Sequence, residues 1–165
     1  MPGIRRATAA DAADIARIYN QGIEERTSTF ETQARDPDQI ASRLAEPESP
    51  PLLVAEEDGR VVGWAGLSAY SERDCYLGIG EASMYIDRDA RGRGIGVRLG
   101  EELAREAARQ GYWKIVGLLL ADNARSIGVA KAAGARVVGT FRAHAQLEGR
   151  WRDVVVIEVR LARTP

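Results

Sequence analysis

The chain has 165 residues, of which 45% are apolar and 28% charged, and its formal net charge is −1. This composition is typical of a soluble globular protein, and the length predicts a single domain over residues 1–165. A net charge so close to zero provides no overall field for nucleic acid or an anionic membrane, so neither is an expected partner. Cys75 is the one cysteine, which excludes an intrachain disulfide and a cysteine-based metal site.

Helices are predicted from apolar residues at helical spacing, and strands from alternating or continuous apolar runs. In chain order the predicted elements are a strand (3–8), a helix (8–25), a helix (36–46), a hairpin (52–70), a strand (80–87), a helix (95–110), a strand (114–120), a helix (123–134) and two closing strands (135–145 and 151–161). Asp58-Gly59 is the predicted turn of the hairpin, because both turn positions need a positive φ.

This order of elements predicts an α/β protein with a largely antiparallel sheet. One βαβ crossover is expected, formed by the strand at 80–87, the helix at 95–110 and the strand at 114–120. The longest apolar runs are too short to cross a bilayer, and the N-terminus lacks the pattern of a signal peptide. We therefore expect a cytoplasmic protein.

Glycine and arginine are concentrated in the segment 88–96, between the first strand and the helix of this crossover. A helix N-terminus offers unpaired N–H groups and a positive dipole end, so a glycine-rich loop before it can hold a phosphate. The dinucleotide fingerprint does not fit, because Val97 stands at its third glycine position, and no Gly-Lys-Ser/Thr follows to make a P-loop. A tight turn with solvated arginines is the alternative.

Two stretches, "YIDRDARGRGIGVRLGEEL" and "ADNARSIGVAKAAGA", resemble the GCN5-related N-acetyltransferase (GNAT) superfamily, and the order of elements agrees over the whole chain. The resemblance implies a mixed, mostly antiparallel central sheet flanked by helices, with a β-α-β core that binds acetyl-CoA. Three further stretches, "YNQGIEERTSTFE", "RDCYLGIGEASMYI" and "GTFRAHAQLEGRWRDVVVIE", are similar to the phosphinothricin and methionine sulfone/sulfoximine acetyltransferase group.

This second resemblance implies acetyl transfer to the α-amine of a small amino acid or a toxic analogue of the phosphinothricin, methionine sulfone/sulfoximine or arsinothricin type, and hence resistance to such compounds. The amine would attack acetyl-CoA directly in a ternary complex, without a metal, and the subgroup implies a homodimer. Glu81 matches the general base of the group; a surface glutamate at a strand end is the alternative for it.

The resemblance also assigns binding residues. Those for acetyl-CoA are Met84, Tyr85, Ile86, Arg91, Gly92, Arg93, Gly94, Ile95, Gly96, Asn123 and Ser126. Those for the acceptor are Phe30, Arg73, Asp74 and Cys75. Plain capping of the next helix is an equally compatible role for Asn123 and Ser126, and the two roles can coexist. Arg88 has no place in the motif.

The sequence departs from the family pattern at two positions. Ala130 stands where many members have a tyrosine that protonates the leaving thiolate. Glu148 stands where phosphinothricin enzymes carry a histidine, and we interpret the only histidine, His144, as structural. Trp151 and Asp153 are expected at a dimer interface or in the core. A peptide N-acetyltransferase and a non-catalytic acyl-CoA-binding module are the competing hypotheses for function.

Overall fold

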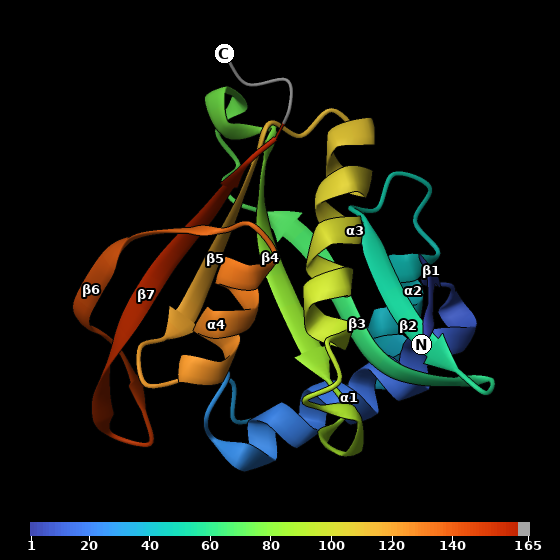
Figure 1. Cartoon of the computed structure of the whole chain (residues 1–165), viewed down its shortest axis with the longest axis horizontal. Coiled ribbons are helices and arrows are strands. Elements are labelled where there is room, and N and C mark those ends of the chain that lie inside the picture. The colour runs from blue at the N-terminus through green and yellow to red at the C-terminus, as the bar shows by residue number, and fades with distance from the viewer. Residues whose placement is uncertain (162–165) are drawn as a thin grey trace.

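The computed structural model describes residues 1–161, and one sheet runs through them (Figure 1). Its seven strands lie in the order β1-β2-β3-β4-β5-β7-β6, and each neighbouring pair is antiparallel except β4 and β5. The strands are β1 Gly3–Arg6, β2 Leu52–Glu57, β3 Arg60–Ala69, β4 Ile79–Ile86, β5 Lys114–Leu120, β6 Arg136–Leu147 and β7 Arg150–Arg160. The helices are α1 Ala12–Glu25, α2 Pro37–Leu44, α3 Ile95–Arg109 and α4 Ala124–Ala132, with short 3-10 turns η1 Ala9–Asp11, η2 Asp74–Tyr76 and η3 Arg88–Ala90.

The predicted α/β architecture with a mostly antiparallel sheet is confirmed, and its elements lie where the periodicity indicates. The largest boundary difference is in the first helix, which is predicted from residue 8 but begins at Ala12, because η1 occupies the preceding turn. Asp58 and Gly59 both have positive φ angles, 51° and 75°, as expected for the tight hairpin turn. Glu148 and Gly149 repeat this geometry between β6 and β7, at 50° and 77°.

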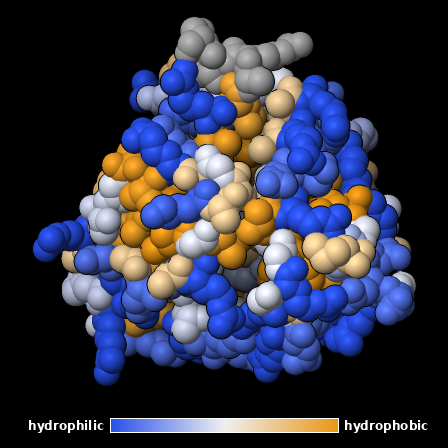
Figure 2. Space-filling view, in the orientation of Figure 1, coloured by the Kyte–Doolittle hydropathy of each residue, from blue (hydrophilic) through white to orange (hydrophobic). Residues whose placement is uncertain are grey.

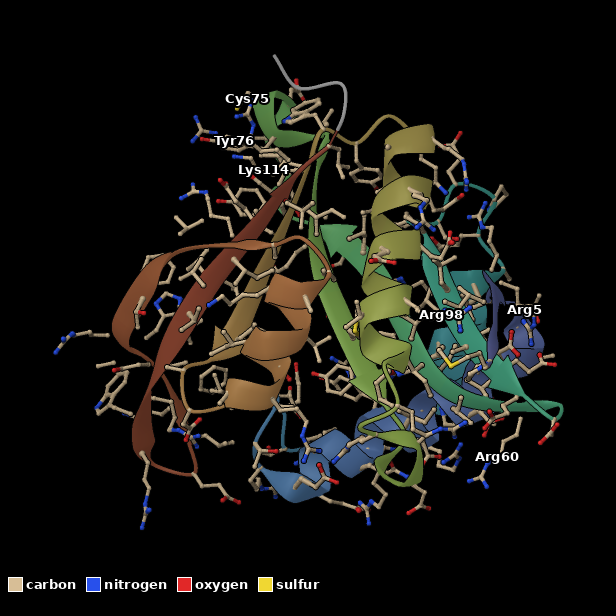
Figure 3. The ribbon with its side chains drawn as sticks, viewed as in Figure 1. Arg5, Arg60, Cys75, Tyr76, Arg98 and Lys114 are labelled. Carbon is tan, nitrogen blue, oxygen red and sulfur yellow. The ribbon has the colours of Figure 1, made fainter. Side chains whose placement is uncertain are left out.

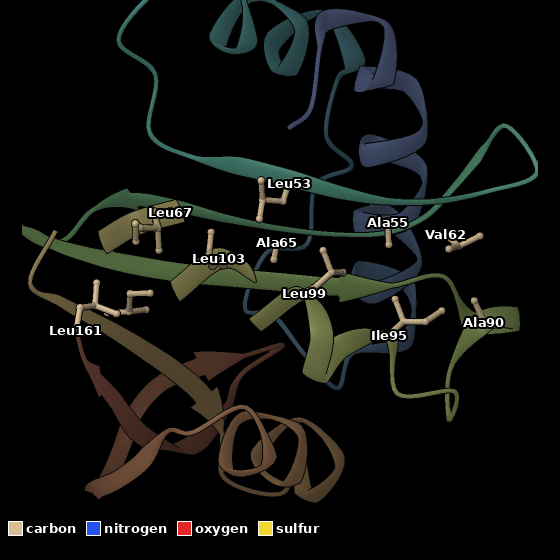
Figure 4. Close-up of a cluster of buried hydrophobic side chains, with 12 residues drawn as sticks. Leu53, Ala55, Val62, Ala65, Leu67, Ala90, Ile95, Leu99, Leu103 and Leu161 are labelled. Atoms are coloured by element: carbon tan, nitrogen blue, oxygen red, sulfur yellow. The ribbon is translucent and has the colours of Figure 1, made fainter. Parts of the chain in front are cut away.

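Two apolar cores cover opposite faces of strands β1–β4. Ile95, Leu99 and Leu103 lie on one side of α3 and pack against one face (Figure 4). Ile15 and Ile18 of α1 pack with α2 against the other face. The apolar stripe on α3 fixes the rotation of that helix against the sheet, and hence the place of its N-terminus. Within residues 1–161, no helix combines the length and apolar content needed to cross a membrane.

Strands β4 and β5 are paired over only a short stretch, from Ile79↔Lys114 to Glu81↔Val116. Both strands continue beyond the last pair without sharing a ladder, so they separate there. The separation divides the structure into two parts. We call β1–β4 with α1–α3 the first arm, and β5–β7 with α4 the second arm. The space between the arms is the feature that positions the functional site.

The carboxylate of Asp11, a residue that is 6% exposed, links the first strand to the first helix. Two Nη atoms of Arg5 donate to its two oxygens, each at 2.8 Å, and the Thr8 N–H donates to Oδ2 at 2.7 Å. The hydrogen bonds from Arg5 lower the pKa of Asp11 from 3.8 to about 2. The resulting stability is therefore fully present above the ordinary pKa of 3.8, and it is lost as the pH falls through about 2.

We expect Asp11→Asn to lower the free energy of unfolding at neutral pH by about 1–3 kcal/mol, because Arg5 loses a charged acceptor. The variant should then lose less stability than the wild type between about pH 4 and about pH 2. Urea unfolding across this range measures both effects. Asp14→Asn, which removes a partly exposed carboxylate paired with Arg17, is the control for the loss of one carboxylate. An unchanged acid dependence in the Asp11 variant would contradict the linkage.

Candidate functional site

The diverging ends of β4 and β5 border a cavity of about 910 Å³. Figure 2 shows its opening between α3 and α4, with apolar side chains around it. Its size lies within the range of about 300–1,000 Å³ that is usual for ligand pockets. Both arms contribute to its walls: Ala82, Met84, Tyr85 and Ile86 from β4, Ile115, Gly117 and Leu119 from β5, and Ile157 and Val159 from β7. We refer to this cavity as the cleft.

Within residues 1–161, the cleft-facing edge of β4 carries backbone groups that have no strand partner beyond Glu81. The Asp87 N–H donates to the Val62 carbonyl at 2.9 Å, so Asp87 faces β3. Because hydrogen-bonding direction alternates along a strand, the N–H and C=O groups of Ala82, Met84 and Ile86 face the cleft, whereas those of Tyr85 face β3. The Ile86 carbonyl has the expected direction, since it accepts a hydrogen bond from Arg91 Nε on the cleft side at 3.1 Å. An extended ligand can therefore bind along this edge as an added strand does.

The N-terminus of α3 opens into the same cleft. Its N-cap is Gly94, which has a φ of 77°, no side-chain cap and no acidic residue in the first turn. Gly92 has the same φ, and a Cβ built on either glycine meets nothing within 4 Å. Both glycines therefore provide a left-handed turn with an accessible backbone. The first N–H groups of α3 and its positive dipole end can therefore bind an anion at the cleft wall.

The three arginines of the loop occupy different environments. Arg91 lines the cleft and donates through Nη1 to Glu25 Oε2 at 2.9 Å. Arg93 is outside the cleft lining, because its guanidinium donates to both Glu57 oxygens at 2.9 and 2.6 Å. Arg88 also borders the cleft, and it pairs with Glu24 at 3.0 Å. Of the two arginines predicted to bind the ligand, the structure brings only Arg91 to the cleft.

Gly96 has a packing role that the motif does not reveal. It is buried at the start of α3, and a Cβ built on it would lie 3.0 Å from Val129 Cγ1 of α4. The missing side chain lets α3 and α4 approach closely over the cleft. Gly96 lines the cleft as well, so a substitution there would change the packing of the two arms together with the binding surface.

Asn123 and Ser126 lie at the mouth of the cleft and cap α4. Asn123 Oδ1 accepts from the Ser126 N–H at 3.1 Å, which is the capping role left open by the sequence. Asn123 Nδ2 donates to the Thr27 carbonyl, also at 3.1 Å, and so connects α4 to the segment that follows α1. Ala130 forms part of the cleft wall, at the position where many family members carry tyrosine.

Glu81 lies at the point where the strands separate, as the last residue of β4 paired to β5. Its side chain is partly exposed and, by strand alternation, on the same face of β4 as Tyr85. Within residues 1–161 its carboxylate forms no hydrogen bond or ion pair. Glu81 is not among the residues that line the cleft, but its unpaired carboxylate lies directly before them along β4, where the two strands separate.

The predicted acceptor residues lie beyond opposite ends of β4. Phe30 follows Ser28 and Thr29, which are bonded to the hydroxyls of Tyr85 and Tyr19 at 3.4 and 3.1 Å. Burial raises the pKa of Tyr85, so its hydroxyl remains a donor to the Ser28 carbonyl.

Arg73 precedes η2, and its Cζ lies 5.8 Å from the centroid of the Tyr76 ring. Figure 3 shows Cys75 and Tyr76 near Lys114, at the paired end of β4 and β5, and Asp74 begins the same turn. Arg73, Asp74 and Cys75 therefore lie at the paired end of β4, whereas Ser28, two residues before Phe30, contacts Tyr85 near the other end.

The remaining residues singled out in the sequence lie on the second arm. His144 is exposed on β6 and stacks on Phe141, with ring centroids 4.5 Å apart. Asp153 accepts from the Ala143 N–H at 2.8 Å and holds a bulge in β6. Trp151 is 62% exposed, so in this chain it is not a core residue.

Sequence reasoning also missed several cleft residues, because they come from distant elements that only the fold brings together. Glu25, Thr27 and Ser28 reach the cleft from the end of α1 and the segment after it, and Arg125 reaches it from α4. No local motif marks these positions. The contact of Glu25 with Arg91, in the loop before α3, depends on how α1 crosses the sheet.

The splayed sheet, with a helix N-terminus beside a strand edge that has no ladder partner, gives an α/β protein whose cleft suits a long phosphorylated ligand. The model of the acetyltransferase (GNAT) family matches residues 15–135. The chain is 31% identical to an L-methionine sulfoximine/L-methionine sulfone acetyltransferase of Pseudomonas aeruginosa, over 98% of this chain and 95% of that protein.

Two solved structures resemble this fold closely. The phosphinothricin acetyltransferase of Sinorhizobium meliloti in complex with acetyl-CoA has a TM-score of 0.90 and 28% identity, covering 99% of this chain and 92% of that one. A ribosomal-protein-alanine N-acetyltransferase from Brucella melitensis has a TM-score of 0.91 and 31% identity, covering 96% and 99%. The chain therefore belongs to the acetyltransferase (GNAT) family. It is an acetyl-CoA-dependent N-acetyltransferase.

Proposed function

We propose that this enzyme acetylates the α-amine of a small amino acid or a toxic analogue of the phosphinothricin, methionine sulfone/sulfoximine or arsinothricin type, and so confers resistance to such compounds. The observation that carries the proposal is the carboxylate of Glu81, which has no partner within residues 1–161 and lies at the point where β4 and β5 separate, next to the cleft residue Ala82. The names of the Pseudomonas and Sinorhizobium relatives support the class of acceptor.

The residues of the cleft fit acetyl-CoA, which supplies a reactive acetyl thioester. The free N–H groups of Gly94, Ile95 and Gly96 would hold the pyrophosphate, with Arg91 and the turn at Gly92 beside them. The cleft-facing backbone groups of Met84 and Ile86 would hold the pantetheine arm, while Tyr85, Asn123 and Ser126 shape the walls. Arg93 would support the loop from outside through its pair with Glu57.

Glu81 is proposed as the general base, because an α-amine is largely protonated near neutral pH and must lose a proton before it attacks. The carboxylate would take this proton directly or through one water, with acceptor and acetyl-CoA bound together. A cleft-facing N–H of β4 would polarise the acyl carbonyl. Because Ala130 has no proton to give, water would protonate the leaving thiolate.

We propose that the acceptor binds between Phe30 on one side and Arg73, Asp74 and Cys75 on the other. The planar fork of Arg73 suits a carboxylate or a phosphinate-type oxyanion, since it can donate two parallel hydrogen bonds.

We also propose a cytoplasmic homodimer. Apolar side chains exposed on the second arm are available for its interface: Leu118, Val138, Phe141 and Trp151.

A panel assay that detects free thiol tests the proposed acceptor class. Methionine sulfone, methionine sulfoximine, phosphinothricin, arsinothricin, ordinary amino acids and a short peptide are compared with one batch of enzyme. We expect the analogues to give the highest kcat/KM and the peptide to give none. Turnover of the peptide alone would favour the second candidate, peptide acetylation, which the similarity to the Brucella enzyme supports. Acetyl-CoA binding without turnover of any acceptor would favour a binding module.

A further inference from the structure

Two polar contacts cross the open end of the cleft and join its two arms. Arg26 Nε, just after α1, donates to Glu148 Oε1 in the β6–β7 turn at 2.9 Å. The contact between Asn123 and Thr27 is the second. In Figure 1 the C-terminal end of α1 and the tip of the β6–β7 hairpin lie together at the lower left. Beyond the last β4–β5 pair no ladder joins the two strands, and these side-chain contacts connect the arms there.

Both members of the ion pair have an uncommon backbone conformation. Arg26 ends α1 with a φ of 57°, and Glu148 opens the hairpin turn with a φ of 50°. Non-glycine residues adopt this left-handed region only at some cost in free energy. Arg26 also donates through Nη1 to the Ile23 carbonyl, which anchors its guanidinium to the helix end. The side chains are therefore held toward each other from both arms.

The pair is exposed, at 36% for the Arg26 side chain and 57% for that of Glu148. Ion pairs exposed to this degree are weak, so this one can open and close without unfolding either arm. Such a contact suits a cleft that must admit a long ligand and then retain it. Charge attraction across the opening favours the closed spacing of the arms.

We propose that Arg26 and Glu148 form a strap across the cleft that holds the two arms at their binding distance and slows the escape of bound acetyl-CoA. The proposal rests on the proposed function, in which acetyl-CoA occupies this cleft. It also assigns a role to the glutamate that replaces histidine in the hairpin turn: Glu148 positions the arms, and does not take part in proton transfer.

Charge reversal with rescue tests the strap. We expect Arg26→Glu and Glu148→Arg each to speed dissociation of acetyl-CoA in stopped-flow fluorescence by about two- to fivefold, the range that a weak ion pair supports. The double reversal should return the rate to the wild-type value. The matched control reverses Arg105 and Glu101, an exposed pair within α3 that does not cross the cleft, and should leave dissociation unchanged.

The strap would be overturned if the single variants released acetyl-CoA at the wild-type rate, or if the double reversal failed to restore that rate. If the Glu148 variant changed only the KM of the amine, Glu148 would be assigned to acceptor binding, and the strap would also be overturned. A double-mutant cycle on urea unfolding of the ligand-free protein measures the coupling of the pair separately. If the wild type bound no acetyl-CoA, the proposed function would fail, and this coupling would still report whether the two arms are joined.

Discussion

Glu81→Gln is expected to lower kcat by about 10²- to 10⁴-fold, the range that a positioned general base contributes. Glutamine keeps the size of the side chain but cannot accept a proton. Because the Glu81 carboxylate has no bonding partner within residues 1–161, the substitution removes no folding contact. The affinity for acetyl-CoA and the urea unfolding midpoint should therefore stay at their wild-type values. Steady-state kinetics, calorimetry and urea unfolding on one preparation separate these quantities.

Glu72→Gln makes the same chemical change at an exposed position in the connection between β3 and β4, and it should keep full activity. Glu81→Asp distinguishes the two routes for the proton. If Glu81 contacts the amine directly, the shorter aspartate should lower kcat almost as much as glutamine does. If a water bridges the two groups, the water can shift and kcat should stay closer to the wild-type value. Near-normal turnover by Glu81→Gln would show that Glu81 is only a surface residue at the strand end.

Local features of this fold were predictable from the sequence because a few neighbouring residues determine them. The turn at Asp58-Gly59 needs two positive φ angles, and Asn123 caps the helix that directly follows it. The separation of β4 and β5 after Glu81 is different in kind. It depends on how α3 and α4 pack over strands distant in the chain, and no periodicity within β4 or β5 encodes it.

The same distinction applies to the candidate site. The glycine loop was identified because Gly92 and Gly94 stand at a fixed distance before an amphipathic helix. The motif assigns Arg93 to the ligand, but no motif predicts that the hairpin of β2 and β3 brings Glu57 to its guanidinium. The pair of Arg26 with Glu148 joins residues far apart in the chain, and spacing alone cannot predict such a partner.

Gly94→Ala is expected to weaken acetyl-CoA binding by about 10- to 100-fold, because the N–H groups that follow it lose their alignment with the anion. The φ of 77° at Gly94 is unfavourable for alanine, and the new methyl group would stand where the backbone is now open. The strain alone lowers the free energy of unfolding by about 1–2 kcal/mol. Calorimetric titration with acetyl-CoA and urea unfolding measure the two effects on one sample.

Gly111→Ala provides the matched control, since Gly111 follows the opposite end of the same helix with a φ of 90° and equally open surroundings. Both variants carry a similar backbone strain, so both should lose a similar amount of stability. Only the change at the N-terminal end should alter acetyl-CoA affinity, because only that end presents free N–H groups to the cleft. Equal affinities in the two variants would mean that the phosphates bind elsewhere, and that Gly92 and Gly94 serve the turn alone.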